Sequence, residues 1–289
     1  MMRDFFMPAY RVALLPLLFT LTLSGCASLS SVSQPSLDKE AGEALRLAHT
    51  LRDNQRLQAA YEVYARMDER GQLRGSYLLE YASVAATVRP AGEALALYQR
   101  TRQELGGDPS ALPAEQAQAL CNGLGRARLS LGQATLAERD FRCAVQAVPH
   151  DLQALNGLGV AYNLQKRDGD AREQFQKALE IDPSYTPALN NLALSWLASG
   201  DSGKAIGLLN QARSQGDISL QLNLALAYVF SGHEDTAQAV LLENMEAQYA
   251  GQILQQFRTA RARVDAGAPL ASELLAASQQ PLALSEQAE

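Results

Sequence analysis

Apolar and small residues recur along this chain with a period of 34 residues, which indicates an internal repeat. The clearest unit spans residues 152–185 and reads LQALNGLGVAYNLQKRDGDAREQFQKALEIDPSY. Its apolar residues follow a three- and four-residue spacing in two stretches that polar residues separate. The pattern predicts two amphipathic helices joined by a turn, with their apolar faces packed against each other.

The same pattern occurs on both sides of this unit, so that six units fit the chain. Four units cover residues 118–251, and two degenerate units cover residues 41–108. Residues 109–117, which contain Pro109 and Pro113, interrupt the register and are interpreted as an insertion. The sequence therefore predicts about six helical hairpins in series.

Three positions of the repeat keep one kind of residue in all six units. The first helix has a small slot at Ala48, Ala82, Gly125, Gly159, Ala193 and Ala225. The second helix has a small slot at Ala60, Ala94, Ala137, Ala171, Ala205 and Ala237. One turn later a large slot holds Tyr64, Tyr98, Phe141, Phe175, Leu209 and Leu241. Since small residues let two helices approach closely, we expect the helices to cross at the small slots.

The unit at 152–185 also carries Leu-Gly, Tyr, Ala, Phe, Ala and Pro at fixed offsets, namely Leu158, Gly159, Tyr162, Ala171, Phe175, Ala178 and Pro183. This order resembles the tetratricopeptide repeat. The resemblance implies an all-α, right-handed solenoid of six hairpins. Residues 252–264 are predicted to form a C-terminal capping helix. Residues 265–289 are predicted to contribute a short helix at most and then a disordered tail.

Residues 1–25 have the features of a targeting segment and lie outside the repeat. Arg3 and Arg11 supply positive charge, and residues 12–23 form an apolar stretch too short for a comfortable membrane span. The stretch LSGCAS then places small residues immediately before Cys26. These features predict a signal peptide that ends at this cysteine.

LSGCAS resembles the lipobox of bacterial lipoproteins. The resemblance implies cleavage before Cys26, a diacylglycerol thioether on its sulfur, and fatty acylation, such as palmitate, of the new N-terminus. Ala27 stands where an inner-membrane retention signal would have Asp, which implies an anchor in the outer membrane and a body that faces the periplasm. Residues 26–40 would then be the lipidated cysteine and a flexible tether. An ordinary signal peptide with an incidental cysteine is the alternative interpretation.

The chain is acidic, with a formal net charge of −6 and a pI near 5.2. This balance argues against a nucleic-acid partner, because no basic stripe could neutralise phosphates. His49, His150 and His233 lie in different units and share no metal-ligand spacing. No glycine-rich phosphate loop or nucleophile elbow is found in the sequence. We therefore expect no enzymatic activity, no cofactor, no metal site and no small-molecule substrate.

Cys121 and Cys143 fall on the two predicted helices of one unit. A disulfide between them is possible in an oxidising compartment such as the periplasm. The direction of the Cys143 side chain is less certain from the repeat, because this residue lies one position before a small slot. Two reduced, buried thiols are therefore the favoured state, and the disulfide is the alternative.

Asparagines recur on the first helices of successive units and form the candidate binding site. Asn122, Asn156 and Asn190 share one repeat position, whereas Asn191 and Asn223 share the next one. In tetratricopeptide arrays the first helices line the concave groove, so this resemblance implies a row of amides along a groove. An amide offers a donor and an acceptor, which suits an extended peptide. We expect Arg126 and Asn163 to face the same groove.

A purely structural role for the asparagines is the alternative, in which their amides only tie neighbouring helices together. Asn190 and Asn191 cannot point in the same direction, because adjacent helical residues diverge by about 100°. Trp196 lies where Tyr162 and Tyr228 lie in neighbouring units. Core packing is therefore favoured for Trp196 over a role in ligand binding.

The paired stretches NNLALSWLASG and LNLALAYVFSG, at 190–200 and 222–232, resemble the lipoproteins of tight-adherence (Flp) pilus assembly. This resemblance implies a protein-binding scaffold that helps assemble or localise the secretin through which the pilus passes. The expected partners are therefore a secretin or other pilus assembly components, besides the membrane that holds the lipid. A type IV pilus pilotin, or another envelope-assembly lipoprotein with the same repeats, is the alternative.

Overall fold

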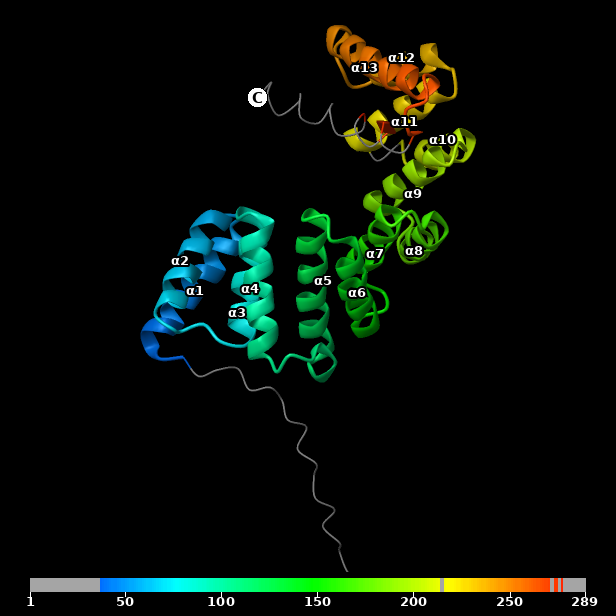
Figure 1. Ribbon diagram of the computed structural model, residues 1–289. Coiled ribbons are helices and arrows are strands. Elements are labelled where there is room, and N and C mark those ends of the chain that lie inside the picture. The colour runs from blue at the N-terminus through cyan, green and yellow to red at the C-terminus, as the bar shows by residue number, and fades with distance from the viewer. Residues whose placement is uncertain (1–36, 214–215, 271–272, 275–276, 278–289) are drawn as a thin grey trace, which may run out of the picture. The chain divides into compact units, whose positions relative to one another are not determined.

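A computed structural model describes residues 37–213, 216–270, 273–274 and 277. Its fold is an all-α array of thirteen α-helices in stacked pairs over these residues, as the repeat predicts (Figure 1). The helices are α1 (Lys39–Asp53), α2 (Leu57–Glu69), α3 (Ser76–Val88), α4 (Ala91–Glu104), α5 (Ala114–Ser130), α6 (Ala134–Ala147), α7 (Leu152–Leu164), α8 (Asp168–Ile181), α9 (Thr186–Ala198), α10 (Ser202–Gln211), α11 (Ile218–Phe230), α12 (Glu234–Leu242) and α13 (Ala247–Asp265). None of the described helices combines the length and the apolar character that crossing a membrane requires.

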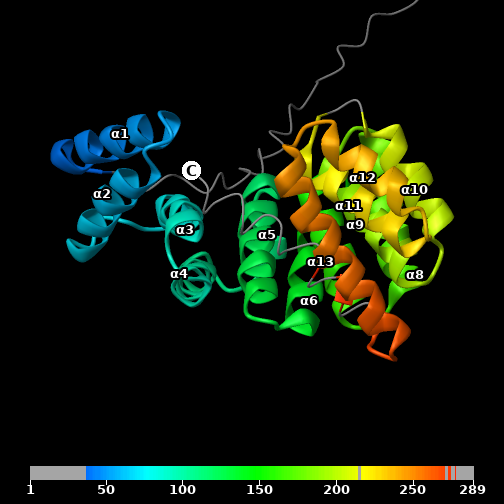
Figure 2. The same ribbon diagram turned by 90° about the horizontal axis from the view of Figure 1, so that it is seen from above.

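Consecutive helices pack against each other along the whole array (Figure 2). The six pairs from α1–α2 to α11–α12 are the predicted hairpins, and α13 packs against both α11 and α12. The odd-numbered helices from α3 to α13 also contact one another in succession. Side chains on these helices can therefore interact from one hairpin to the next.

Aspartates begin several of the helices by accepting hydrogen bonds from free backbone N–H groups. Asp38 caps α1, Asp151 caps α7, and Asp217 caps α11 in this way. In the predicted insertion, Asp108 caps a short 3₁₀ helix, Pro109–Ala111, that connects α4 to α5. Residues 109–113 are therefore an ordered connection between the second and third hairpins, whereas residues 114–117 of the predicted insertion form the first turn of α5.

The small slots lie at the helix crossings, and this confirms the proposed register. The alanines of both slots are at most 1% exposed. A Cβ added to Gly159 would lie 2.4 Å from the Phe175 ring, and one added to Gly125 would lie 2.9 Å from the Phe141 ring. These distances are too short for a real contact, so Phe141 and Phe175 require glycine opposite them.

Left-handed backbone occurs at the turns inside the hairpins, where glycine is expected. Gly132, Gly200 and Gly232 have positive φ there, but Gln55 and Lys166 adopt the same conformation at the equivalent turns. At Lys166 the turn is closed by a hydrogen bond from the Arg167 backbone N–H to the Tyr162 carbonyl, at 3.0 Å. The backbone geometry of the repeat is thus kept even where the glycine is not.

The C-terminal segment differs from its prediction in the position at which the capping helix begins. The capping helix α13 begins at Ala247, five residues before the predicted start at 252. Residues 270, 273–274 and 277 are helical, and Leu274 and Ala277 are each 3% exposed within the core cluster that contains Phe257. These residues belong to the short helix that the sequence allows after residue 265, and they are buried because the array offers them an apolar surface to cover.

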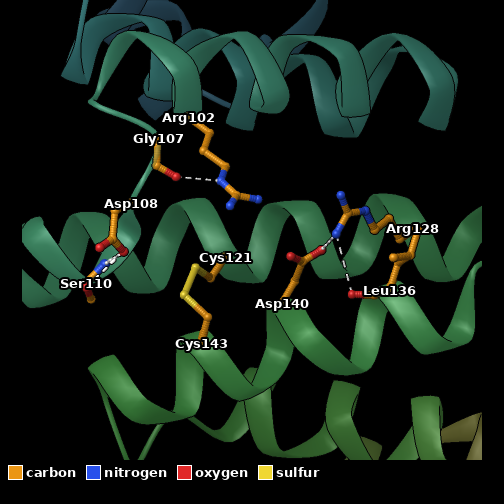
Figure 3. Close-up of a disulfide and its surroundings, with 9 residues drawn as sticks. All are labelled: Arg102, Gly107, Asp108, Ser110, Cys121, Arg128, Leu136, Asp140 and Cys143. Carbon is orange, nitrogen blue, oxygen red and sulfur yellow. Dashed lines mark hydrogen bonds and ion pairs between the residues drawn. A yellow bond between two sulfur atoms is a disulfide. The ribbon is translucent and has the colours of Figure 1, made fainter.

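A disulfide joins Cys121 of α5 to Cys143 of α6 (Figure 3). The two Cα atoms are 5.9 Å apart, which lies within the range that a disulfide requires. Reduced thiols are the state that the sequence favours, because Cys143 lies one position before a small slot and the repeat does not set the direction of its side chain. The structure differs because the close crossing of α5 and α6 turns Cys143 toward its partner.

A buried ion pair links the same two helices. Arg128 of α5 is 7% exposed and Asp140 of α6 is 5% exposed, and the guanidinium donates to the carboxylate (Figure 3). Burial raises the pKa of Asp140, and the Arg128 charge opposes that shift. Such a pair is costly to break, because the remaining charge would be buried without a partner.

Replacing Gly159 with Ala tests the steric fit of glycine to Phe175. Overpacking costs about 1–3 kcal/mol and should outweigh the gain of about 1 kcal/mol that alanine brings to a helix. We expect Gly159→Ala to lower the denaturation midpoint, and Phe175→Leu in the same chain to cancel part of that effect. The matched control is Gly169→Ala, since a Cβ there meets no atom within 4 Å. Equal midpoints for Gly159→Ala and the control would contradict the fit.

Removing the disulfide should destabilise the protein by about 2–4 kcal/mol, because the bond closes a loop over a sequence separation of 22 residues. Urea denaturation of Cys121→Ala/Cys143→Ala measures this loss. Added reductant should lower the midpoint of the parent protein but leave that of the double variant unchanged. Finding two alkylatable thiols at these positions in the unfolded, unreduced protein would rule the bond out.

Candidate peptide-binding surface

The asparagines of the odd-numbered helices form hydrogen bonds with one another. Asn191 of α9 donates from Nδ2 to Oδ1 of Asn156 on α7, at 2.9 Å. Asn223 of α11 likewise donates from Nδ2 to Oδ1 of Asn190 on α9. The alternative role, in which the amides tie helices together, therefore describes these two pairs.

Asn190 and Asn191 serve opposite neighbours, as the angle between adjacent helical residues requires. Asn191 reaches back to α7, whereas Asn190 reaches forward to α11. Asn156, Asn190 and Asn191 are half-buried, so part of each side chain can still be reached by solvent. The row is thus both a connection between helices and an exposed polar surface.

Asn122 joins α5 to the start of α7 through a different partner. Its Nδ2 donates to Oδ2 of Asp151 at 3.2 Å, and the side-chain amide of Gln118 donates to the same oxygen. The other carboxylate oxygen of Asp151 accepts from the backbone N–H of Gln153 at 2.9 Å and so caps α7. Asn122 is only 4% exposed, so it is the least accessible member of its row.

Three of the asparagines have an amide oxygen that is buried without a hydrogen-bond partner among the described residues. These oxygens are Oδ1 of Asn122, Asn163 and Asn223. A buried acceptor without a partner costs about 1–3 kcal/mol. Apolar packing alone does not explain why amides are kept at these positions.

Arg126, also expected at the groove, is exposed on α5, and no ion pair of Arg126 is found in the described part of the chain. It lies one helical turn after Asn122, so the repeat places a cation next to the amide row. The structure leaves this guanidinium open to solvent. Arg126 is therefore available for an acidic group or a C-terminal carboxylate of a partner.

Trp196 contributes to packing but is also bordered by two cations. Its ring is half-buried and packs against the core. The Arg172 guanidinium lies 4.3 Å from the ring centroid, and the Lys204 ammonium lies 3.9 Å from it. Arg167 covers the equivalent Tyr162 ring at 4.2 Å. These rings are thus covered by the protein's own cations.

The histidines form no common cluster. His49 binds Glu80 through Nε2 at 2.6 Å, and His233 contacts Ser231 at 2.9 Å. No group of His, Cys, Asp or Glu within the described ranges could hold a metal ion. Cys26 lies outside the described residues.

Sequence reasoning missed a hollow of about 470 Å³ where α3, α5 and the α1–α2 turn meet, which we call the α3–α5 hollow. Its walls come from the degenerate N-terminal units and from the start of α5. The lining residues include Leu57, Leu79, Val84 and Ala119, with Glu80 and Glu115 among the polar ones. The sequence contains one indication of an apolar site here. Leu79 occupies the repeat position at which later units have Asn122, Asn156 and Asn190, so an apolar side chain replaces the amide.

Comparisons with known proteins agree with the repeat. Residues 122–186 match the family model described as tetratricopeptide repeat. The crystal structure of a tetratricopeptide repeat protein from Parabacteroides merdae covers 83% of this chain and 99% of its own, with a TM-score of 0.60 and 17% identity. At that identity the likeness concerns the fold alone.

Curated relatives are similar over short segments. The probable UDP-N-acetylglucosamine--peptide N-acetylglucosaminyltransferase SPINDLY of Petunia hybrida is 30% identical over 120 residues, which is 42% of this chain and 12% of the relative. Cellulose synthase operon protein C of Komagataeibacter xylinus is 32% identical over 80 residues, which is 26% of this chain and 6% of the relative. The chain thus spans only a small part of these relatives.

The family match runs from the middle of α5 to the end of α8, and the same paired-helix packing extends on both sides of it. The spacing of small and large residues in the remaining hairpins follows the matched ones. The chain therefore contains tetratricopeptide repeats at residues 122–186, within a longer array of the same paired-helix fold.

Proposed function

We propose that this protein is a periplasm-facing, protein-binding scaffold held in the outer membrane by a lipid on Cys26. Its proposed role is in the assembly of the Flp/Tad (type IVb) pilus, where it would help assemble or localise the secretin channel, in the manner of TadD. Binding rather than catalysis is the proposed activity. The observation that carries the proposal is the uninterrupted contact of the odd-numbered helices from α3 to α13, because it supports a long surface with side chains in register.

Two features support protein binding at this surface. Tetratricopeptide-repeat domains bind protein partners, and here the half-buried amides of Asn156, Asn190 and Asn191 run from α7 to α9. Amides can pair with both N–H and C=O groups of an extended peptide. Exposed Arg126 adds a cation at the α5 end of the amide row.

Two further features support the proposed location. The disulfide between Cys121 and Cys143 suits an oxidising compartment, and the periplasm is one. LSGCAS at residues 23–28 has the order of a lipoprotein cleavage site. Several acyl chains on Cys26 would give stable anchoring, at about 0.8 kcal/mol for each buried CH₂ group. The pilus role itself is proposed from the paired stretches at 190–200 and 222–232.

Lipidation is tested with Cys26→Ser. Labelled palmitate should be incorporated into the parent protein and not into the variant, since the variant has no thiol to accept the first lipid. The parent should fractionate with the outer membrane, and the variant should lose that association. An unlabelled parent protein of unchanged mass would contradict lipidation, whereas a labelled protein in the inner membrane would contradict only the location.

The binding surface is tested by capture of the secretin encoded beside the pilus ATPase in the same genome. Asn156→Ala/Asn190→Ala should weaken capture about tenfold, since two hydrogen bonds contribute about 0.5–1.5 kcal/mol each. The matched control is Gln103→Ala/Gln176→Ala, which removes two exposed amides from the even-numbered helices α4 and α8.

Thermal unfolding of both variants confirms that they are folded before capture is compared. Equal capture by the two variants would leave the asparagines with a structural role only. If the protein captures only a pilotin-dependent secretin or another envelope component, the proposed role in the Tad pilus is contradicted. The alternative role, as a pilotin or another envelope-assembly lipoprotein, is then supported.

A further inference from the structure

The α3–α5 hollow lies on the same helices that continue into the asparagine row. Its α3 wall includes Ser76, Leu79, Ser83 and Thr87, which follow the three- and four-residue spacing of one helix face. Its α5 wall includes Ala119, which lies one turn before Asn122. The hollow is therefore positioned to receive one part of a chain that also contacts the amides.

The walls of the hollow favour an apolar side chain. Leu79 and Val84 of α3 form its base, and Leu57 of α2 and Ala119 of α5 flank it. The hydroxyl of Ser83 donates to the Leu79 carbonyl, and the hydroxyl of Thr87 donates to the Val84 carbonyl. These hydroxyl protons are used within α3, so they are not offered to a ligand. A volume of about 470 Å³ falls in the range of small ligand pockets.

The charged residues that line this apolar space are Arg52, Glu80 and Glu115, and Glu80 is already paired with Arg52 and His49. Arg52 at its edge lies 3.5 Å from Glu80 and 3.0 Å from Asp53, so one guanidinium faces two carboxylates. Glu115 is exposed on the α5 side, and no ion pair of Glu115 is found among the residues that the structure describes. The charges at the hollow thus favour a cation next to the apolar group.

Two lining residues carry buried oxygens that lack a partner. Oγ of Ser76 and Oε1 of Gln116 have no hydrogen bond to any described residue. Both oxygens accept hydrogen bonds, and they belong to opposite walls of the hollow. Both oxygens are buried, so the groups that a ligand in the hollow meets are the apolar side chains and the exposed Glu115.

We propose that the α3–α5 hollow binds a segment of the protein partner through one large apolar side chain adjacent to a lysine or an arginine. The apolar side chain packs on Leu79 and Val84, and the cation lies beside Glu115. This inference rests on the proposed scaffold function and names the chemistry of the segment that the scaffold recognises. Beyond Ala119 the same segment continues over the amides.

The test selects phage-displayed random peptides on the full chain, purified in detergent, and measures the affinity of the selected peptides by fluorescence anisotropy. The selected peptides should share a large apolar residue next to Lys or Arg. Glu115→Lys should weaken their binding about fivefold and reduce its dependence on salt. Ala119→Phe should weaken it about tenfold or more, because the ring fills the hollow.

Glu180→Lys is the matched control, since Glu180 is an exposed carboxylate on α8 and the change in charge is the same. It should leave the affinity unchanged. Because Ala119→Phe could disturb packing, its denaturation midpoint is compared with that of the parent, and Glu115→Lys tests the same hollow from an exposed position.

The outcomes separate this inference from the proposed scaffold function. If the selected peptides bind Glu115→Lys and Ala119→Phe as tightly as the parent, the hollow is not their site. If they then lose affinity for Asn156→Ala/Asn190→Ala, the scaffold function stands without the hollow. Selected peptides without the apolar–basic pair overturn the proposed chemistry. If no peptide is enriched on the parent, both the inference and peptide binding by the scaffold are contradicted.

Discussion

In each hairpin, the two helices can cross closely only where one residue has no side chain beyond Cβ. At Gly125 and Gly159 even a Cβ would overlap the Phe141 and Phe175 rings, which fill the crossing from the second helix. This steric constraint fixes how each helix is rotated about its axis. Because the constraint returns in every hairpin, equivalent positions in successive hairpins face the same way. The arrangement of every other side chain on the odd-numbered helices depends on this register.

The asparagine pairs are a consequence of that register. Asn191 and Asn223 occupy one repeat position. Each donates to an asparagine of the preceding odd-numbered helix, which lies one repeat position earlier in its own unit. The last unit begins near residue 218, two residues earlier than the 34-residue period would place it. Leu222 therefore occupies the repeat position that Asn190 occupies in the unit before. The polar connection therefore ends at α11. At the other end, Asn122 reaches the cap residue Asp151 instead of an asparagine, because α7 has Gly157 at the position of Asn191.

The register could be predicted from the sequence because its cause is local and repeats six times. The features that were missed depend on contacts that a repeat pattern does not contain. Cys143 faces α5 because of the rotation of α6, and Leu274 is buried because distant helices leave an apolar surface for it. Lys166 adopts a left-handed backbone that the sequence assigns to glycine, at a cost of about 1–2 kcal/mol that neighbouring hairpins can offset. The positions of Asn156 and Asn190 were predictable, but their partners were not.

The repeat position of Asn156 does not hold an amide in every hairpin. Leu79 in α3 and Leu222 in α11 occupy the repeat position of Asn156, so the fold accepts an apolar residue there. Asn122 and Asn223 each have a buried oxygen without a partner among the described residues, which costs about 1–3 kcal/mol relative to a satisfied one. The Nδ2 groups of the same amides donate to Asp151 and Asn190, so leucine at these positions would remove a connection between helices. The amides thus connect successive odd-numbered helices from α5 to α11, and the half-buried Asn156, Asn190 and Asn191 also present polar groups to solvent, whereas Leu79 at the same repeat position as Asn156 lines the apolar hollow.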